Sequence, residues 1–379
     1  MTGRARWLAT FALAGVSAFG CNALLGIDDG AYAPGVDGSV PPGPDATVED
    51  GGGIVDGATP DVAPDAPIVK TDAGNDIIAQ DQSGVISLVQ DDQNLYWLSN
   101  GAVMTAPKSG GVAPKPIASA PGATVLAVDP GPASAGSVYV AVDREIKSYP
   151  KVTGTATTLT TLAMNHSTVA MGSDGSALLF VESDENDKTS VRRVPRVGGA
   201  VTTLSAAQNV AVLGVTKDWA AFIDEPNGDT NRKVYEVQPP SSGSPTPHDT
   251  AVGFTIFSDI RTLFLGSNKM YWLDSTGTGA ALRSHDRGAA PVVTVATFTT
   301  VEEPFLVVGN ATHAYVVLKA SSVTPVRYEV VRVQQGVGAR TSIVTDLENP
   351  TGLVLSGTSL FVAEDKPFSK GTIQRIALP

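Results

Sequence analysis

The sequence holds a single cysteine, Cys21, among its 379 residues. One cysteine cannot form an internal disulfide, and it cannot supply the several thiolates of a cysteine-based zinc site. Stability must therefore come from burial of apolar side chains, and 42% of the residues are hydrophobic. That share, in a chain of this length, is ample for a sizeable core.

Positive charge is also scarce. The chain has 26 Lys and Arg against 38 Asp and Glu, for a formal net charge of −12. Residues 28–76 alone hold 11 acidic residues and one lysine, so the remainder is close to balanced. Without a basic field to attract phosphate backbones, no nucleic-acid partner is expected.

Long hydrophobic runs are absent beyond the N-terminus, so no transmembrane helix is predicted. The one apolar run, Trp7–Phe19, follows the basic segment Met1–Arg6 and is too short to span a bilayer. This arrangement is typical of a signal peptide, which we place at residues 1–20. The chain is thus expected to be exported.

Gly20-Cys21 directly follows this apolar run. The pair resembles the lipobox of bacterial lipoproteins, whose cysteine is diacylated and becomes the new N-terminus. The resemblance implies lipidation of Cys21, with a membrane as a partner and, because Asn22 rather than Asp follows, an outer-membrane location in the cell envelope. Ala18 and Gly20 would also suit ordinary signal peptidase, which would leave a secreted protein.

Residues 21–76 are predicted to be a disordered acidic tether. Gly and Pro make up 16 of the 49 residues in 28–76, and Tyr32 is the only aromatic residue there. Such a segment cannot bury enough apolar surface to offset its chain entropy. Its like charges and prolines should keep it extended.

Residues 77–379 lack helical periodicity and instead repeat short β-rich runs separated by turn residues. One strand recurs seven times, at intervals of 43, 40, 42, 50, 44 and 46 residues. The copies are Leu95–Leu98, Val138–Ala141, Leu178–Val181, Ala220–Ile223, Met270–Leu273, Ala314–Val317 and Leu360–Ala363. An apolar strand precedes each copy, and a third strand follows it. Six copies then add a fourth strand, after a turn that contains glycine, as in Lys108-Ser-Gly-Gly111 and Arg196-Val-Gly-Gly199.

The seventh copy lacks its fourth strand, whereas Asp76–Gln80 looks like a fourth strand with no third before it. Ring closure explains both. The sequence therefore predicts an all-β fold, a seven-bladed β-propeller of four-stranded blades over residues 77–379, closed by this N-terminal strand pairing with the C-terminal blade. Closure also removes the unpaired edges of an open array.

Tyr96-Trp97 and Tyr271-Trp272 occupy the second and third positions of two of these copies. With the Gly-Gly turns, they make residues 77–379 resemble the YWTD and NHL-type propellers and the propeller domains of bacterial surface lipoproteins. The resemblance implies the fold more than any function. Because the aromatic residues recur at one strand position, we expect them to pack between blades.

Catalytic motifs are missing. There is no Gly-x-Ser-x-Gly elbow, phosphate-binding loop or dinucleotide fingerprint. The four histidines lie in different repeats and are expected to be solvated. Some propellers of the resembled families are metal-dependent lactonases, but their metal-binding Glu and Asn residues have no residue-by-residue match here.

The most informative local feature is a set of acidic residues after the second strand of several repeats. In a propeller these loops share a face with the connections between blades. The ligand-face candidates are Glu182, Asp184, Glu185, Asp187, Asp224, Glu225, Asp229 and Asp274. Solvated loops, a cationic ligand and Ca²⁺ are all compatible with them, and Asp184, Asp187, Asp224 and Asp229 are the calcium candidates. No other cofactor is expected.

Three functions follow from these features. The first is a binding module that presents loops to a protein, glycan or small ligand. The second is a hydrolase of lactonase or sugar-hydrolysing type, which would need several carboxylates or amides converging on the propeller axis. The third is a structural or assembly role in the cell envelope. The missing catalytic motifs favour the first.

Overall fold

The computed structural model describes residues 69–70, 76–152, 155–205, 210–224, 233–238, 243–249, 260–276, 279–288, 291–320, 326–366 and 370–379. Every regular element in this part of the chain is a β-strand. No helix within these ranges is long and apolar enough to cross a membrane. Cys21 and the predicted signal peptide lie outside the described residues.

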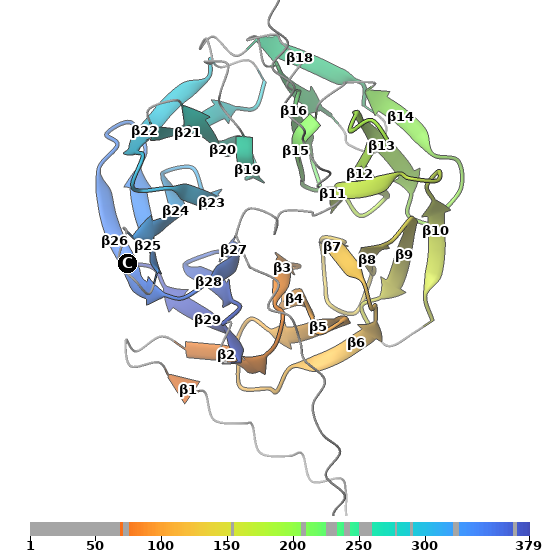
Figure 1. Ribbon diagram of the computed structural model, residues 1–379, viewed down its shortest axis with the longest axis horizontal. Coiled ribbons are helices and arrows are strands. Elements are labelled where there is room, and N and C mark those ends of the chain that lie inside the picture. Colours follow the sequence, from red (N-terminus) through yellow and green to blue (C-terminus); the bar gives the residue numbers. More distant parts are fainter. Residues whose placement is uncertain are drawn as a thin grey trace, which may run out of the picture.

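The strands form seven antiparallel sheets, the blades, arranged as a ring (Figure 1). Blade one comprises β3 (Ile86–Gln90), β4 (Asn94–Ser99), β5 (Ala102–Pro107) and β6 (Lys115–Ser119), and blade two comprises β7 (Ala123–Val128), β8 (Ser137–Val142), β9 (Glu145–Pro150) and β10 (Thr157–Thr161). Blade three comprises β11 (Ser167–Ser173), β12 (Ala177–Ser183), β13 (Thr189–Pro195) and β14 (Thr202–Ser205), and blade four comprises β15 (Val210–Val215), β16 (Ala220–Asp224), β17 (Lys233–Val237) and β18 (Pro245–Asp249).

Blades five to seven comprise β19 (Ile260–Leu265), β20 (Lys269–Thr276), β21 (Gly279–Asp286), β22 (Val293–Thr299); β23 (Pro304–Gly309), β24 (His313–Ala320), β25 (Arg327–Gln334), β26 (Arg340–Leu347); and β27 (Pro350–Ser356), β28 (Ser359–Glu364), β29 (Gly371–Ala377) with β2 (Asp76–Gln82). In each blade the first strand lies nearest the axis and the fourth lies at the perimeter (Figure 1). Each axial strand contacts the next around the whole ring. The predicted seven-bladed, all-β propeller is confirmed.

The fourth strand of blade seven is β2, which pairs antiparallel with β29. Arg375 on β29 donates from its Nε to Asp76 on β2, at 3.0 Å. The Trp97 indole of blade one donates to Gln82, also on β2, at 3.1 Å. The N-terminal strand therefore connects the last blade to the first.

A short fifth strand, β1 (Val69–Lys70), pairs with the outer edge of β2. It lies inside the segment that was predicted to be a tether. Regular structure therefore begins earlier than residue 77, because the open edge of β2 offers hydrogen-bonding groups to the approaching chain.

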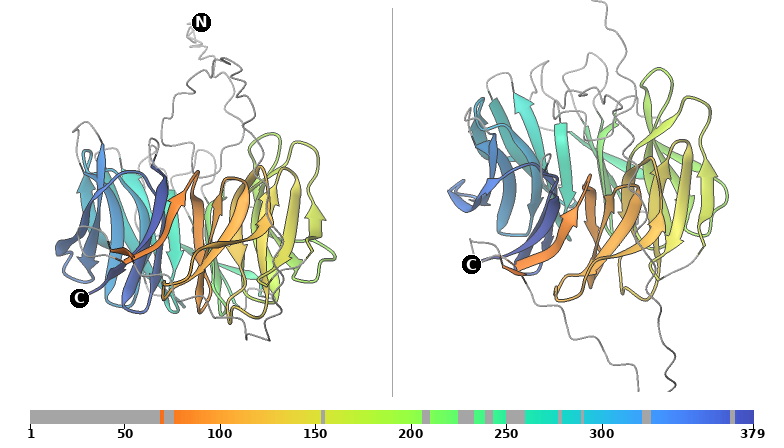
Figure 2. Two further views of the ribbon diagram at one scale, coloured as in Figure 1. Left: turned by 90° about the horizontal axis from the view of Figure 1, so that it is seen from below. Right: turned by 60° about the horizontal axis from the view of Figure 1, so that its bottom comes forward.

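The ring has two faces, because successive strands of a blade run in opposite directions. One face carries the connections from second to third strands and the linkers from blade to blade; we call it the linker face. The other carries the connections from first to second and from third to fourth strands; we call it the turn face. Figure 2 shows the ring from the side, with loops along both faces.

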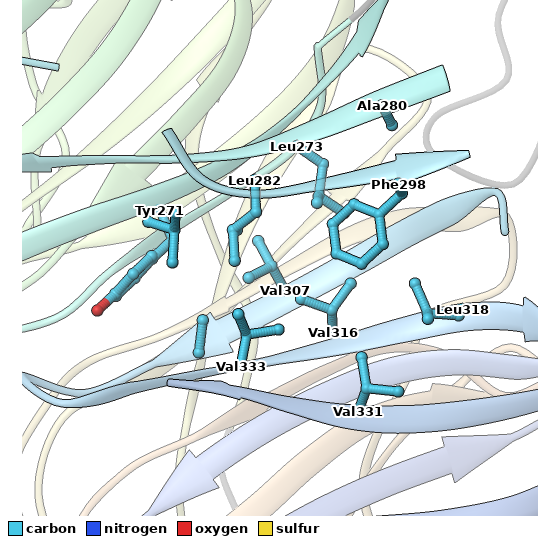
Figure 3. Close-up of a cluster of buried hydrophobic side chains, with 12 residues drawn as sticks. Tyr271, Leu273, Ala280, Leu282, Phe298, Val307, Val316, Leu318, Val331 and Val333 are labelled. Carbon is cyan, nitrogen blue, oxygen red and sulfur yellow. The ribbon is translucent and has the colours of Figure 1, made fainter. Parts of the chain in front are cut away.

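The core consists of apolar seams between neighbouring blades. Alternate residues of each second strand face opposite seams, since strand side chains alternate between the two faces of the sheet. In Figure 3, Leu282 and Phe298 of blade five lie against Val316 and Val331 of blade six. Full burial of such a side chain stabilises the fold by about 1.5–3 kcal/mol.

The recurring aromatic residues pack in these seams, as predicted. Trp97 faces blade seven, and Tyr96, the residue before it, faces blade two. Trp272 faces blade four, and Tyr271 faces blade six. All four side chains are fully buried. Their recurrence is therefore explained by packing.

Two seams are also joined by buried polar groups near the turn face. Asp91 of blade one accepts a hydrogen bond from the Tyr96 hydroxyl at 2.7 Å and pairs with Lys151 of blade two at 2.9 Å. In the next seam, Asp129 accepts hydrogen bonds from Tyr139 of its own blade and from Ser173 of blade three. Each aspartate thereby links two blades.

Candidate functional site at the linker face

Four of the acidic residues that follow the recurring strand belong to the strand itself. Glu182, Asp224, Asp274 and Glu364 stand at its fifth position in blades three, four, five and seven. Their exposed fractions are 7, 8, 0 and 3%. Three of them are ligand-face candidates from the sequence, and the structure buries them instead of exposing them on the surface.

Glu182 and Asp274 each take part in a polar arrangement of the same kind, which spans three strands of their own blade. In blade three, Arg192 donates from Nε to Glu182 at 2.7 Å and from a terminal nitrogen to the Thr203 hydroxyl. In blade five, Arg283 donates in the same way to Asp274 at 3.1 Å and to Thr294 at 2.6 Å. Each acid thus joins the second, third and fourth strands of its blade, which is a structural role.

Blade three adds a histidine to this arrangement. His166, on the linker from blade two, lies with Nδ1 2.7 Å from Oε1 of Glu182. The contact holds the C-terminal end of the turn that contains Met164 and Asn165 against β12. Met164 is 74% exposed, and Asn165 has φ of 64°. The linker and the end of β12 are therefore fixed to each other.

A second histidine corrects the expectation that all four are solvated. His285 is 2% exposed, and its Nε2 lies 2.9 Å from Oε1 of Glu236 across the seam between blades four and five. The equivalent third-strand positions of other blades hold buried apolar residues such as Val194 and Val333. The pair is a local polar replacement within an apolar seam.

The exposed acids gather on the hairpin between β12 and β13. Glu185 and Asp187 are exposed, and Asp184 is half-buried. Oδ1 of Asp184 accepts from the backbone amides of Asn186 at 2.8 Å and Lys188 at 2.9 Å. These two amides hold the pKa of Asp184 below its ordinary value, so its carboxylate is ionised near neutral pH.

The metal candidates do not form a closed set within the described ranges. No three His, Cys, Asp or Glu side chains gather there closely enough to hold a metal ion. Asp224 is buried, and Asp184 is bonded by its own hairpin. Glu225 and Asp229 lie outside the described residues. Calcium binding therefore stays a prediction.

The axial strands have an unusual feature at the linker face. Each contains a shift of pairing register near its start, which is a β-bulge. The residues at these shifts are Ser87, Leu88, Thr124, Val169, Ala211, Arg261, Phe305 and Thr351. Bulges are common beside ligand sites because they redirect side chains. The sequence alone did not predict them, since a one-residue shift leaves the apolar pattern of a short strand nearly unchanged.

The seven axial strands carry no Asp, Glu, His, Cys, Lys or Tyr. Arg261 is their one charged residue. Carboxylates or imidazoles for acid–base catalysis would therefore have to come from elsewhere in the chain.

Comparison with known proteins supports the fold and no closer relationship. No protein-family model and no curated protein matches the chain. Among solved structures, an oligogalacturonate lyase in complex with manganese is 10% identical with a TM-score of 0.56, over 83% of this chain and 96% of the other. YCF48 bound to D1 peptide is 8% identical with a TM-score of 0.52, over 83% and 98%.

A puromycin hydrolase is 12% identical with a TM-score of 0.60, and the match covers 78% of this chain but only 52% of the hydrolase. Identities this low establish a shared propeller fold and leave activity open. The resemblance to YWTD and NHL-type propellers stays a prediction.

Proposed function

We propose that this chain is an exported, lipid-anchored binding module whose linker face contacts its ligand. The main support is the composition of the axial strands, which contain no carboxylate and no histidine. A hydrolase working from the propeller axis would need such groups there. A binding module needs only a rigid frame and exposed loops.

The ligand we favour is a cationic peptide or protein segment. Glu185 and Asp187 are exposed, Asp184 is ionised, and Met164 is exposed on the linker pinned to the same strand. An acidic surface beside an apolar side chain suits a basic segment better than an anionic small molecule. Lys188 is the one cation of this hairpin and does not balance its three acids.

The fold is compatible with this use. YCF48, whose structure resembles this propeller, is described as bound to a peptide. The lyase and the hydrolase show equally that similar propellers occur in enzymes. The two functions must therefore be separated by experiment.

The binding test uses the full chain with Cys21→Ser, so that no lipid is attached, and an array of basic, neutral and acidic peptides together with a glycan array. We expect basic peptides to bind best, and Glu185→Lys with Asp187→Asn to weaken binding at least tenfold. Asn is chosen because it tolerates the φ of 59° at residue 187. The control changes exposed turn-face acids, Asp92→Asn with Asp218→Lys, and should bind normally.

Equal binding by both double variants would refute the assignment to this hairpin. The same preparation is incubated with chromogenic esters, lactones and glycosides, with and without Mn²⁺. We expect no turnover above the buffer rate. Turnover that survives purification would favour the hydrolase.

The anchoring is tested separately by cell fractionation. Diacylation of Cys21 should hold the protein firmly, since two acyl chains bind a bilayer far more stably than one. We expect Cys21→Ser to move the protein from the membrane to soluble fractions. An unchanged distribution would leave the secreted form as the better interpretation.

A further inference from the structure

The large exposed hydrophobic residues are not scattered over the propeller. Four of the eight in the described residues lie in the connection between a third and a fourth strand, in blades one, two, three and six, and a fifth is the first residue of the fourth strand of blade five. They are Val112, Val152, Val197, Val293 and Val337, with exposed fractions of 52, 56, 89, 50 and 72%. The corresponding connection of blade four lies partly outside the described residues, and blade seven takes its fourth strand from the N-terminus.

These connections all lie on the turn face. The first residue of each donates its backbone N–H to the carbonyl of a residue in the turn before the second strand. The pairs are Lys108 with Gln93, Lys151 with Gly136, Arg196 with Ser176, Arg287 with Asn268 and Gln335 with Thr312, at 2.9–3.2 Å. The valines therefore stand in a broken ring around the perimeter of one face.

The turn geometry does not require valine. Glycines with positive φ make these turns, for example Gly199 at 122° and Gly336 at 74°, and a Cβ added at either would meet nothing within 4 Å. Repeated exposure of an apolar side chain at the same end of several blades points to a surface that the structure does not contain.

The charges around the valines are one-sided. The connections at 108–114, 151–156, 196–201, 238–244, 287–292 and 335–339 contain no acidic residue. They contain four cations, Lys108, Lys151, Arg196 and Arg287. Lys151 is buried against Asp91, Arg196 lies 3.7 Å from Asp129, and Lys108 donates to the Asp91 carbonyl and to Ser356. Arg287 has no acidic side chain as a partner in the described residues. Exposed acids on this face, Asp92 and Asp218, lie in the turns between first and second strands.

We propose that the turn face rests on an anionic lipid surface, with the valines entering the interfacial layer. Separate apolar tips spread around a ring suit a flat and yielding surface better than a second protein, which would need one contiguous, complementary patch. Cations without acids at the tips complement anionic headgroups. This contact is independent of the linker-face ligand, and it would turn that face away from the membrane.

The chain outside the propeller permits this orientation. Residues 22–75 separate Cys21 from the first strand of the ring. Fully extended, 54 residues could span at most about 180–195 Å. The predicted lipid anchor would therefore bring the propeller to a bilayer without dictating which face touches it.

The test measures co-sedimentation of the full chain carrying Cys21→Ser with phosphatidylcholine vesicles and with vesicles of phosphatidylcholine and phosphatidylglycerol at 7:3. We expect binding to the anionic vesicles, weakened at least tenfold by Val152→Ser, Val197→Ser and Val337→Ser together. The matched control, Met164→Ser, Val301→Ser and Val326→Ser, removes exposed apolar side chains outside these connections and should bind normally. Val197→Ser alone, at the most exposed site, is the second variant should the triple variant fold poorly.

Absence of binding by the parent chain, or equal binding by both triple variants, would overturn the proposal. Sedimentation velocity tests whether a second copy of the chain, instead of a membrane, covers the turn face. A concentration-dependent dimer that the valine variants abolish, without vesicle binding, would assign the turn face to a second copy of the chain. The linker-face variant Glu185→Lys with Asp187→Asn should still bind vesicles, so failure of one proposal is distinguishable from failure of the other.

Discussion

The pair formed by Asp91 and Lys151 offers a direct measure of how the seams hold the ring together. Both side chains are fully buried, and 2.9 Å separates Oδ2 of Asp91 from Nζ of Lys151. The carboxylate also accepts hydrogen bonds from the backbone amides of Gln93 and Asn94 and from the Tyr96 hydroxyl. Lys151→Met removes the cation paired with this carboxylate and leaves that charge buried between blades one and two.

We expect Lys151→Met to lower the free energy of unfolding by about 3–5 kcal/mol, the usual cost of an uncompensated buried charge. Asp91→Asn should lower it by a comparable amount, because it leaves the ammonium buried. The double variant should lose less than the sum of the two, by about 0.5–3 kcal/mol, since neither charge remains. Urea unfolding followed by tryptophan fluorescence measures all three values.

The same pair predicts a dependence on pH. Burial by itself would raise the pKa of Asp91, but hydrogen bonds from Lys151, Asn94, Tyr96 and Gln93 outweigh it and hold the pKa below 3.8. The stability that Asp91 contributes is therefore present above its unfolded pKa and is lost as the pH falls through the lower folded value. In Lys151→Met the loss should begin at higher pH, since the largest stabilising hydrogen bond is gone.

The control is Lys147→Met in the same blade, which breaks an exposed pair with Glu145 of similar length, 2.8 Å. We expect no change beyond experimental error, because solvent screens exposed pairs. Equal losses in Lys147→Met and Lys151→Met would refute the reasoning, and so would strict additivity in the double variant.

Three further predictions concern other parts of the ring. Gly172→Ala should destabilise the fold by about 1–3 kcal/mol in urea unfolding, because its Cβ would lie 2.5 Å from Val215 Cβ on the next axial strand, and an unchanged midpoint would contradict that close approach. Tyr139→Phe should cost about 1.5–3 kcal/mol, since its hydroxyl bonds the buried Asp129 carboxylate and burial raises the pKa of the phenol. Thermal midpoints in calcium and in chelator should agree, because Asp184 already bonds two amides of its own hairpin; a clear rise with calcium would restore the metal prediction.

The ring itself was predictable because repetition is visible in a sequence. The recurring strand, a Gly-containing turn and one unmatched strand at Asp76–Gln80 together require a closed array of seven sheets. Aromatic side chains at one repeat position were likewise expected in the seams, since only a seam offers them burial on both sides. The pairing of β2 with β29 occurs where the missing fourth strand left a vacant edge.

The candidate site was less predictable, because acidity alone does not distinguish a loop residue from a strand residue. Glu182 and Asp274 follow four apolar residues, which made them look like the first residues of hairpin loops. Both strands continue through them, and their partners Arg192 and Arg283 lie on the third strand of the same blade. The informative signal was an arginine within an otherwise apolar third strand, since a charge there needs an opposite charge close by.

The repeats also show how one position can serve the fold while its neighbours remain free for function. At the fifth position of the second strand, acids buried in three blades join strands to each other. Immediately beyond it, the loops between second and third strands differ in length and charge from blade to blade. The exposed acids Glu185 and Asp187 lie in this loop of blade three. On the turn face the connections from third to fourth strands contain no acid, and four of them carry an exposed valine, whereas the turns between first and second strands hold Asp92 and Asp218.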